Sequence, residues 1–304
     1  MSQHEQKLAL HAIRSFLQSK SSFDVLPVSY RVVVLDSALL VKRALGILLQ
    51  NSIVSAPLWS SSNSKFVGLL TAKDFLYMLC SDVDWDSLTL DGLKNLSGDG
   101  IESVSINPLK SLYDACLKML QSSARRIPLV DVAEDDPSKE IVVSVLTQYR
   151  ILKFVSMNCK ETRFLQQPLA ELDIGTMSNF SNIVTANLQN SVVSVIHLLV
   201  NNKISAVPIV DEEGKLINVY EAVDVLSLMK SGIATDPQLT VGEALLKRSD
   251  DFEGVYTCTL SDTLFVVLET IRKSRLHRLF VLDNQGALLG VMTLGDILKY
   301  ILFQ

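Results

Sequence analysis

Four segments of the chain repeat one pattern of apolar and polar positions. In residues 203–228 a polar approach leads to an apolar strand with Pro near its start, an acidic Gly turn, a second strand and a helix. The same order recurs around Pro57, Pro128 and Phe280, and with Pro208 these positions are spaced 71, 80 and 72 residues apart. This period exceeds that of the common solenoid repeats, so each unit is predicted to be a small α/β module.

A helix is predicted upstream of each of these strands, because apolar residues recur at i, i+3, i+4 and i+7. The four helical faces fall at 41–49, 112–120, 192–200 and 264–271. Ser111, Ser191 and Ser261 stand where helix N-caps are needed. Each repeat is therefore predicted to run strand, helix, strand, strand, helix.

The predicted fold class is α/β, built of α+β modules that form two pairs. The predicted boundaries are 1–22 for an N-terminal helix, 23–80, 101–158, 174–231 and 252–303 for the repeats, and 1–160 and 161–304 for the pairs. The N-terminal helix is amphipathic through Leu8, Ala12, Phe16 and Ser19, and we expect it to pack on the first repeat. A unit of about 55 residues is marginal alone, so each pair is expected to share a core.

Composition narrows the class of protein. A net charge of −5 argues against a nucleic-acid binder with a basic surface. The most apolar runs, such as 192–200, fall well short of the roughly 18 residues of a membrane span, and the first residues lack an apolar signal core. Four scattered cysteines without C-x-x-C spacing indicate neither a disulfide framework nor a metal site. We therefore expect a reducing intracellular location.

Acids recur at the start of the closing helix in three repeats. Asp74, Asp224 and Asp296 each follow the second strand by a few residues. One interpretation is a capping box beside the positive helix end; the other is an acceptor for the two hydroxyls of a ribose. Repeat two has Arg150 at this place, where a cation opposes the helix dipole, so Arg150 is predicted to serve a phosphate or an internal acid.

Cations precede the Pro-containing strand in two repeats. The paired positions are His277-Arg278 in repeat four, Arg125-Arg126 in repeat two, Ser205-Ala206 in repeat three and Val54-Ser55 in repeat one. A solvated surface is the alternative for an isolated Arg. The start of a core strand favours phosphate binding, because the Arg fork binds phosphate oxygens bidentately. The cluster 272–275 is interpreted as a solvated helix face.

These motifs carry a family resemblance. The h-P-h-h-D strand and the closing G-h-h-T-x-x-D resemble the cystathionine-β-synthase (CBS) domain, of which four in tandem make two pairs. The segments NSIVSAPLW, IVVSVLTQYRILKF, VGEALLKRSDDFEGVYTC and HRLFVLD resemble the gamma, nucleotide-sensing subunit of the AMP-activated/sucrose-non-fermenting protein kinase in its fungal form.

The resemblance implies a flat four-repeat disc that binds AMP, ADP or ATP near its centre. It also implies a non-catalytic subunit in a heterotrimer with a catalytic alpha and a scaffolding beta subunit. We expect this subunit to regulate the kinase under glucose or energy limitation, in the cytoplasm and the nucleus.

The resemblance implies that the site matching the family pattern most fully joins repeats three and four, where Asp296 would bind ribose. The other residues implied there are Thr176, Asn179, Ser181, Ile204, Ser205, His277, Arg278, Thr293, Arg125 and Arg126. Asp224, Asp74 and Arg150 are implied at secondary sites. The Asp74 site is expected to be weak, because Val54 and Tyr149 stand where animal members have Arg and Lys.

Two other classes of function stay open at this point. A scaffold that assembles a complex without sensing nucleotides would not need the three acids. An enzyme would need a nucleophile and base or metal ligands, and the four histidines form no such set. The sequence therefore favours a nucleotide-binding regulator.

Overall fold

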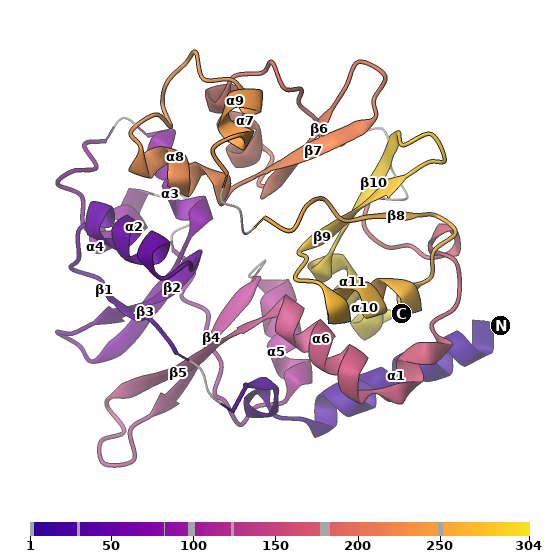
Figure 1. The fold of residues 1–304 in the computed structure, drawn as a ribbon. Helices are drawn as coiled ribbons and strands as arrows, with labels where there is room; N and C mark the ends of the chain where they lie inside the picture. Colours follow the sequence, from indigo (N-terminus) through magenta and orange to yellow (C-terminus); the bar gives the residue numbers. More distant parts are fainter. Residues whose placement is uncertain are drawn as a thin grey trace.

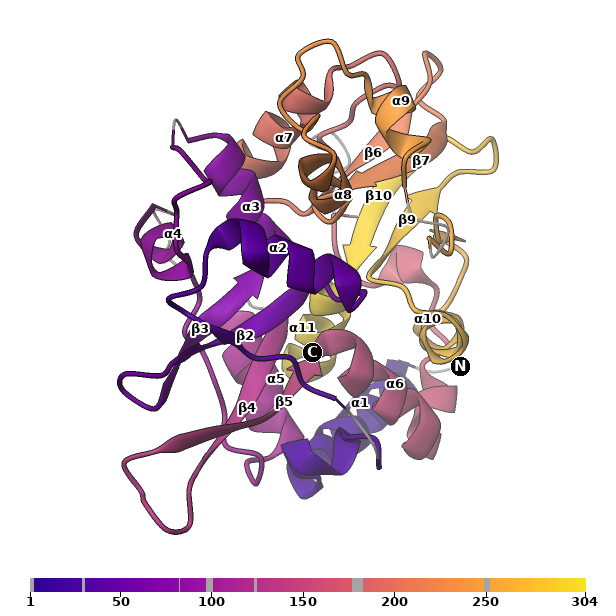
Figure 2. The same cartoon turned by 60° about the vertical axis from the view of Figure 1, so that its left-hand side comes forward.

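The four repeats form a ring around a common centre. The structure, a computed structural model, describes residues 3–28, 31–81, 83–96, 101–122, 125–176, 183–248 and 252–304. Figure 1 shows the repeats following one another around the ring in the order one, two, four, three. The turned view in Figure 2 keeps the same neighbours.

Each repeat supplies a helix, an antiparallel hairpin and a closing helix. Repeat one contains β1 (Leu35–Asp36), α2 (Val41–Gln50), β2 (Ser55–Ser60), β3 (Lys65–Thr71) and α3 (Ala72–Leu79). Repeat two contains α5 (Leu112–Gln121), β4 (Arg126–Val132), β5 (Glu140–Thr147) and α6 (Gln148–Asn158). Repeat three contains α7 (Val192–Asn201), β6 (Ala206–Val210), β7 (Leu216–Glu221) and α8 (Asp224–Lys230). Repeat four contains β8 (Thr257–Thr259), α10 (Leu264–Lys273), β9 (Arg278–Leu282), β10 (Leu288–Thr293) and α11 (Leu294–Phe303).

The remaining elements connect or flank the repeats. They are α1 (Gln3–Ser19), η1 (Ser22–Val25), α4 (Leu90–Leu96), η2 (Lys160–Phe164), η3 (Leu169–Glu171) and α9 (Val241–Leu245). Among the described residues, the predicted first strand of a repeat forms in repeats one and four, as β1 and β8, which run parallel to β2 and β9. In repeats two and three it is reduced to single parallel bridges, Ile106 to Leu129 and Ala186 to Ile209.

All four hairpins share one register. The residue that opens the first strand pairs with the last residue of the second: Ser55 with Thr71, Arg126 with Thr147, Ala206 with Glu221 and Arg278 with Thr293. Each hairpin also contains one register shift further along the strands. Because strand pairing fixes side-chain direction, these paired positions are equivalent in every repeat.

The predicted helix caps are mostly correct. Ser111 and Ser191 are N-caps whose hydroxyls accept from the backbone N–H three residues later. The prediction for Ser261 is wrong, because Thr263 caps α10 instead. The Ser261 hydroxyl lies 2.8 Å from that of Thr259 and belongs to the turn before the helix.

The N-terminal helix packs on a different surface from the one predicted. Its buried face is Ala9, Leu10, Ile13 and Leu17, whereas Leu8 is 57% exposed. The ring of Phe16 lies 5.6 Å from that of Phe154 in repeat two. The helix therefore covers repeats two and four, because the apolar stripe through Leu10, Ile13 and Leu17 is the continuous one.

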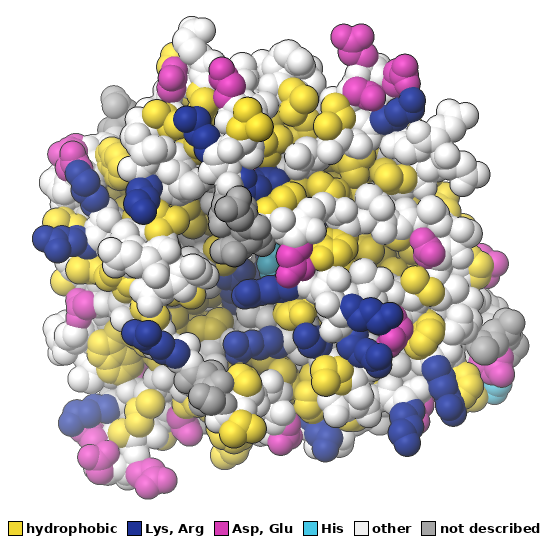
Figure 3. All heavy atoms as spheres, viewed as in Figure 1, with side chains coloured by type: hydrophobic (Ala, Val, Ile, Leu, Met, Phe, Trp, Pro, Cys, Tyr) yellow, Lys and Arg dark blue, Asp and Glu magenta, His cyan; other side chains and the backbone are white. Residues whose placement is uncertain are grey.

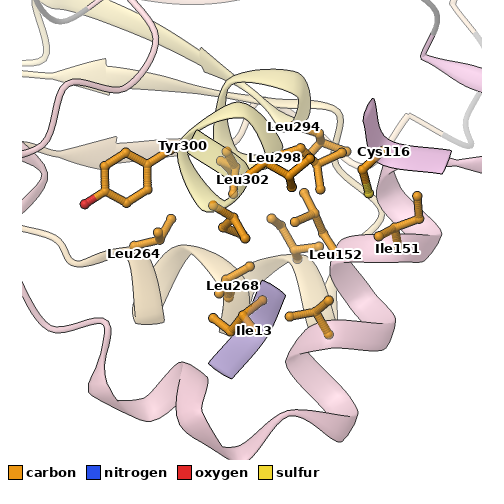
Figure 4. Close-up of a cluster of buried hydrophobic side chains, with 14 of the residues drawn as sticks. Ile13, Cys116, Ile151, Leu152, Leu264, Leu268, Leu294, Leu298, Tyr300 and Leu302 are labelled. Atoms are coloured by element: carbon orange, nitrogen blue, oxygen red, sulfur yellow. The ribbon is translucent and has the colours of Figure 1, made fainter. Parts of the chain in front are cut away.

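The hydrophobic cores join repeats across the predicted pairs. One core combines α1 with repeats two and four, and the other combines repeats one and three. Figure 4 shows the first core, where Leu298 and Leu294 of α11 meet Leu152 and Ile151 of α6. Within the predicted pairs the hairpins meet instead through backbone bonds, such as Glu140 N to Ser64 O at 3.1 Å. The prediction that the two repeats of each pair share a core is therefore wrong, because the apolar helix faces pack against repeats of the other pair.

Across the described ranges, the helices are all too short or too polar to reach from one side of a membrane to the other.

Candidate functional site

The starts of the first hairpin strands of the four repeats converge at the centre of the ring. Arg126 of repeat two donates to the Ser55 hydroxyl of repeat one at 2.7 Å. Arg125 of repeat two donates to the Ser205 hydroxyl of repeat three. Arg278 of repeat four donates to the same hydroxyl at 3.1 Å. Every repeat therefore contributes a strand start to one cluster of side chains.

This cluster carries an excess of positive charge. Figure 3 shows Lys and Arg side chains around a hollow near the middle of this face. The described cations are Arg125, Arg126, Arg275 and Arg278, the imidazole of His277 lies among them, and the described acids are Glu221 and Asp296. Glu221 forms an ion pair with Arg278, in which both side chains are mostly buried. Such a surplus of guanidinium groups favours an anionic ligand.

The electrostatics of the cluster shift the pKa of its basic groups. The side chain of Arg125 is in part exposed to solvent, but the surrounding protein removes most of its bulk hydration. This burial, followed by the charges of Arg278 and Arg126, lowers the pKa of Arg125 to about 10. Burial, followed by the charge of Arg126, lowers the pKa of His277 to about 4. At neutral pH Arg125 and Arg126 are therefore charged and His277 is neutral.

Asp296 lies beside this cluster with one oxygen already engaged. The backbone N–H and the hydroxyl of Thr293 donate to its Oδ2 at 2.8 and 2.7 Å, and Thr293 Oγ1 accepts from Asp296 N–H at 3.2 Å. The capping box is therefore present. Among the described residues Oδ1 has no hydrogen bond, and the charge of Asp296 acts on Arg125. Capping and ribose binding are thus compatible, since they use different oxygens.

Asp74 has the same local geometry in repeat one. Thr71 donates to its Oδ2 from the backbone at 2.7 Å and from the hydroxyl at 2.8 Å. Asp74 is 5% exposed, and burial raises its pKa. No bond in the described part of the chain joins Asp74 to the central cations. Val54 and Tyr149 supply no cation beside it, so the weak-site prediction stays a prediction.

Asp224 is engaged by an arginine that the sequence reasoning did not single out. Arg248 donates from Nε to Asp224 Oδ1 at 2.8 Å and from Nη2 to Oδ2. The N–H of Glu221 donates to the same Oδ2 at 2.7 Å. The guanidinium also donates to Asn218 Oδ1 at 3.2 Å and stacks 4.0 Å from the ring centre of Phe252. Both oxygens of Asp224 are therefore occupied by protein groups.

The other predicted residues occupy separate places. Arg150 donates from Nη1 to the carbonyl of Val145 at 3.2 Å, and burial followed by the charge of Arg275 lowers its pKa. Ile204 packs on the core of repeats one and three just before Ser205. Asn179 and Ser181 lie outside the described residues.

Thr176 is held along β10. Its N–H donates to Val291 O at 3.1 Å, and Val291 N–H donates to its hydroxyl at 2.8 Å. Gly175 has a φ of +69°, and a Cβ there would lie 2.5 Å from Val291 O. The glycine therefore allows the segment to approach the strand that ends at Thr293.

Three positions of this cluster were assigned no binding role from the sequence. Ser55 occupies the hairpin register position of Arg126 and Arg278, and Glu221 occupies the position paired with it, where the other repeats have Thr. Aligning the repeats would have found both. Arg275 was interpreted as part of a solvated face, yet its charge lowers the pKa of Arg126 and His277. Within the described ranges, Arg272 is the residue of that cluster that forms an ion pair along the helix, with Glu269 at 3.3 Å.

Metal ligands do not assemble in the parts of the chain described above. No group of three or more His, Cys, Asp or Glu could hold an ion among those residues. The four cysteines are unpaired thiols, of which Cys80 alone is exposed.

Comparison with known proteins gives similarity over nearly the whole chain. A family model described as the CBS domain matches residues 173–231 and 251–303. The chain is 57% identical over 311 residues to the 5'-AMP-activated protein kinase subunit gamma of Kluyveromyces lactis, covering 98% of this chain and 94% of that protein. It is 55% identical over 309 residues to the corresponding subunit of Saccharomyces cerevisiae, covering 98% and 95%.

The fold is also found among solved structures. A crystal structure of a Methanocaldococcus jannaschii protein superposes with a TM-score of 0.72 at 17% identity, covering 92% of this chain and 99% of that one. The family model matches only repeats three and four, whereas the hairpin register shows the same unit in repeats one and two. The sequence-based prediction of an α/β fold with four such repeats is therefore confirmed.

Proposed function

Because this chain belongs to the family of gamma subunits of 5'-AMP-activated protein kinase, we propose that it senses adenine nucleotides at the centre of its ring. It is a non-catalytic subunit of that kinase family. The observation that carries the proposal is the meeting of Arg125 and Arg278 at the Ser205 hydroxyl, with the Asp296 carboxylate close enough for its charge to act on Arg125. Cations of this kind suit phosphates, and a half-engaged carboxylate suits ribose hydroxyls.

The wider role follows from the family. We propose that nucleotide occupancy reports the cellular energy state to a kinase with a catalytic alpha and a scaffolding beta subunit. We further propose that the complex responds to glucose or energy limitation and acts in the cytoplasm and the nucleus. The alternative is a scaffold that assembles the complex without binding nucleotides.

Calorimetry separates the sensor from the scaffold. The chain is titrated with AMP, ADP, ATP and adenosine at fixed salt. A sensor is expected to bind at least one of the phosphorylated ligands more tightly than adenosine. Absence of binding by any of them in a folded sample would favour the scaffold.

The Asp296→Ala variant is expected to weaken nucleotide binding by about 1–3 kcal/mol, the cost of leaving polar partners unmatched. It also removes an N-cap interaction, which costs about 0.5–2 kcal/mol of stability. Asp74→Ala is a matched control, because Thr71 holds Asp74 with nearly the same distances. We expect both variants to lose stability and only Asp296→Ala to lose affinity at the tightest site. Equal affinities in both variants would leave Asp296 as a cap only.

The Arg278→Gln variant is expected to lose about 1.5–3 kcal/mol of affinity for ATP, the range for a charge-assisted bond. The loss should be smaller for AMP and absent for adenosine, and the salt dependence of ATP binding should flatten. Arg272→Gln is the control, since Arg272 is exposed on α10 and pairs only with Glu269 in the described structure. An equal loss for adenosine and ATP would contradict a phosphate role for Arg278.

A further inference from the structure

Repeat three departs from the other repeats at one register position. The last residue of the second strand is Thr71, Thr147 and Thr293 in repeats one, two and four, and Glu221 in repeat three. Each Thr is the N-cap of the following helix. Helix α8 instead begins at Asp224, with Val223 as N-cap and no side-chain capping bond.

Local helix stability does not explain this departure. A Thr, Ser or Asp N-cap stabilises a helix relative to an uncapped end. Repeat three has Glu221 in place of the Thr, and α8 therefore lacks the stabilisation of a side-chain N-cap. The reason for a carboxylate here must therefore lie outside α8.

The carboxylate of Glu221 is directed at the central cations. It forms an ion pair with Arg278 across the boundary between repeats three and four, and the side chains of Arg278 and Glu221 are 10% and 18% exposed. The other half of the Arg278 guanidinium donates to Ser205 at 3.1 Å. The charge of Glu221 also acts on Arg125 and His277. Glu221 is thus placed where a phosphate oxygen of a ligand would meet Arg278.

Carboxylate and phosphate use the same fork of an arginine. Both accept two parallel N–H bonds from a guanidinium, so one arginine edge cannot serve both at once. A fixed carboxylate beside the site also repels each added phosphate charge. Glu221 therefore acts against anionic ligands in proportion to their charge.

We propose that Glu221 is a built-in competitor for the ligand phosphate, which lowers the affinity of the central site for polyphosphates more than for monophosphates. This inference rests on the proposed function in that the physiological ligand is taken to be an adenine nucleotide. The inference goes beyond that function by naming the residue that sets the preference among ligands with different numbers of phosphates. Glu221 holds Arg278 while the site is empty and gives way when a phosphate arrives.

The test is Glu221→Gln, which removes the charge but keeps an oxygen that can accept from Arg278. Binding of adenosine, AMP, ADP and ATP is measured by calorimetry in wild type and variant. We expect affinity gains of about 3-fold for AMP and about 10-fold or more for ATP, with adenosine unchanged. Glu213→Gln is the matched control, because Glu213 pairs with Lys215 in an exposed turn of the same hairpin.

A second variant shows whether the result with Glu221→Gln comes from the lost charge or from an effect of glutamine on folding. Glu221→Thr installs the residue found in the other three repeats, so it removes the charge and supplies the missing cap for α8. The same order of gains is expected, together with increased stability. Equal changes for adenosine and ATP, or a loss that grows with phosphate number in both variants, would overturn the competitor role.

Inorganic pyrophosphate separates this inference from the proposed function. If no nucleotide binds wild type but pyrophosphate binds Glu221→Gln more tightly than wild type, the sensor proposal fails and the competitor role stands. If nucleotides bind wild type and the variants show no dependence on phosphate number, the sensor stands and the competitor role fails. If neither probe binds any variant, both fail.

Discussion

Replacing Arg248 by Met is expected to lower the free energy of unfolding by about 3–5 kcal/mol, because it leaves a buried carboxylate without its partner. The side chains of Arg248 and Asp224 are only 9% and 11% exposed. Arg248 also donates to Asn218 and to the backbone carbonyl of Val219, and it stacks on Phe252. Met keeps much of the apolar volume, so the lost charge and hydrogen bonds dominate the result.

Urea denaturation measures this loss, with Arg272→Met as the control. Arg272 pairs with Glu269 on an exposed helix face, and such pairs contribute about 0.3–0.5 kcal/mol. The double variant Asp224→Asn with Arg248→Met is expected to be more stable than Arg248→Met alone, because the uncompensated charge is gone. A loss no larger than that of the control would contradict the structural role of the pair.

The pH dependence gives a second readout of the same variant. Burial raises the pKa of Asp224 in the folded protein, and Arg248 opposes this shift. Without Arg248 the folded pKa rises further above the unfolded value of 3.8. Lowering the pH through the raised pKa protonates Asp224 in the folded state, so Arg248→Met should recover part of its lost stability relative to wild type. An unchanged difference from neutral pH down to that pKa would contradict this account.

Leu298→Ala is expected to destabilise the protein by about 2–5 kcal/mol, the range for truncating a buried leucine. Leu298 is fully buried in the core shared by repeats two and four. Figure 4 shows it between α11 and the side chains of Leu152 and Leu268. The damage should therefore spread to α6 in repeat two rather than to repeat three, its neighbour in sequence.

Hydrogen exchange locates the damage. In Leu298→Ala the amides of α6 should lose more protection than those of α7 and β6. Leu199→Ala is the reciprocal variant, since Leu199 is buried in the other core and should expose α3 of repeat one. Joint loss of protection in repeats three and four in either variant would show that the pairs in sequence are the cooperative units.

The repeat pattern predicted the modules well, because the strands and helices of each module are set by the residues of that module alone. The apolar period of 192–200 corresponds to α7, and the second strand predicted within residues 203–228 is β7. Alternation in the strands and an i, i+3, i+4, i+7 face in the helices are set by backbone geometry, which neighbouring modules do not change. These parts of the fold follow from the chain alone.

The partners of each apolar face could not be predicted in the same way. The buried faces of α3, α6, α8 and α11 are all largely apolar, so nothing in their composition distinguishes the correct neighbour. The N-terminal helix has the same ambiguity, because Phe16 and Leu17 fall on adjacent stripes. Packing across the ring depends on shape and on the geometry of the hairpins, which periodicity does not describe.

Part of the site was predictable for a physical reason. Arginines at the start of core strands are rarely explained by solvation, so Arg126 and Arg278 stood out. Glu221 and Arg248 did not, because an acid before a helix and a basic residue after one are ordinary in isolation. Their importance appears only when the strand register and the fold bring Arg278 and Asp224 to them.

Because each core joins repeats that are far apart in sequence, the order of synthesis leaves early helices without their packing partners on the ribosome. The apolar face of α3 in repeat one packs against α7 and α8 of repeat three, which are translated more than a hundred residues later. At about 5–20 residues per second, roughly 8–30 s pass between the synthesis of Ala72 and that of Asp224. During this interval the helix faces of repeats one and two have emerged without their partners, so nascent chains of this protein offer a long window for chaperone binding.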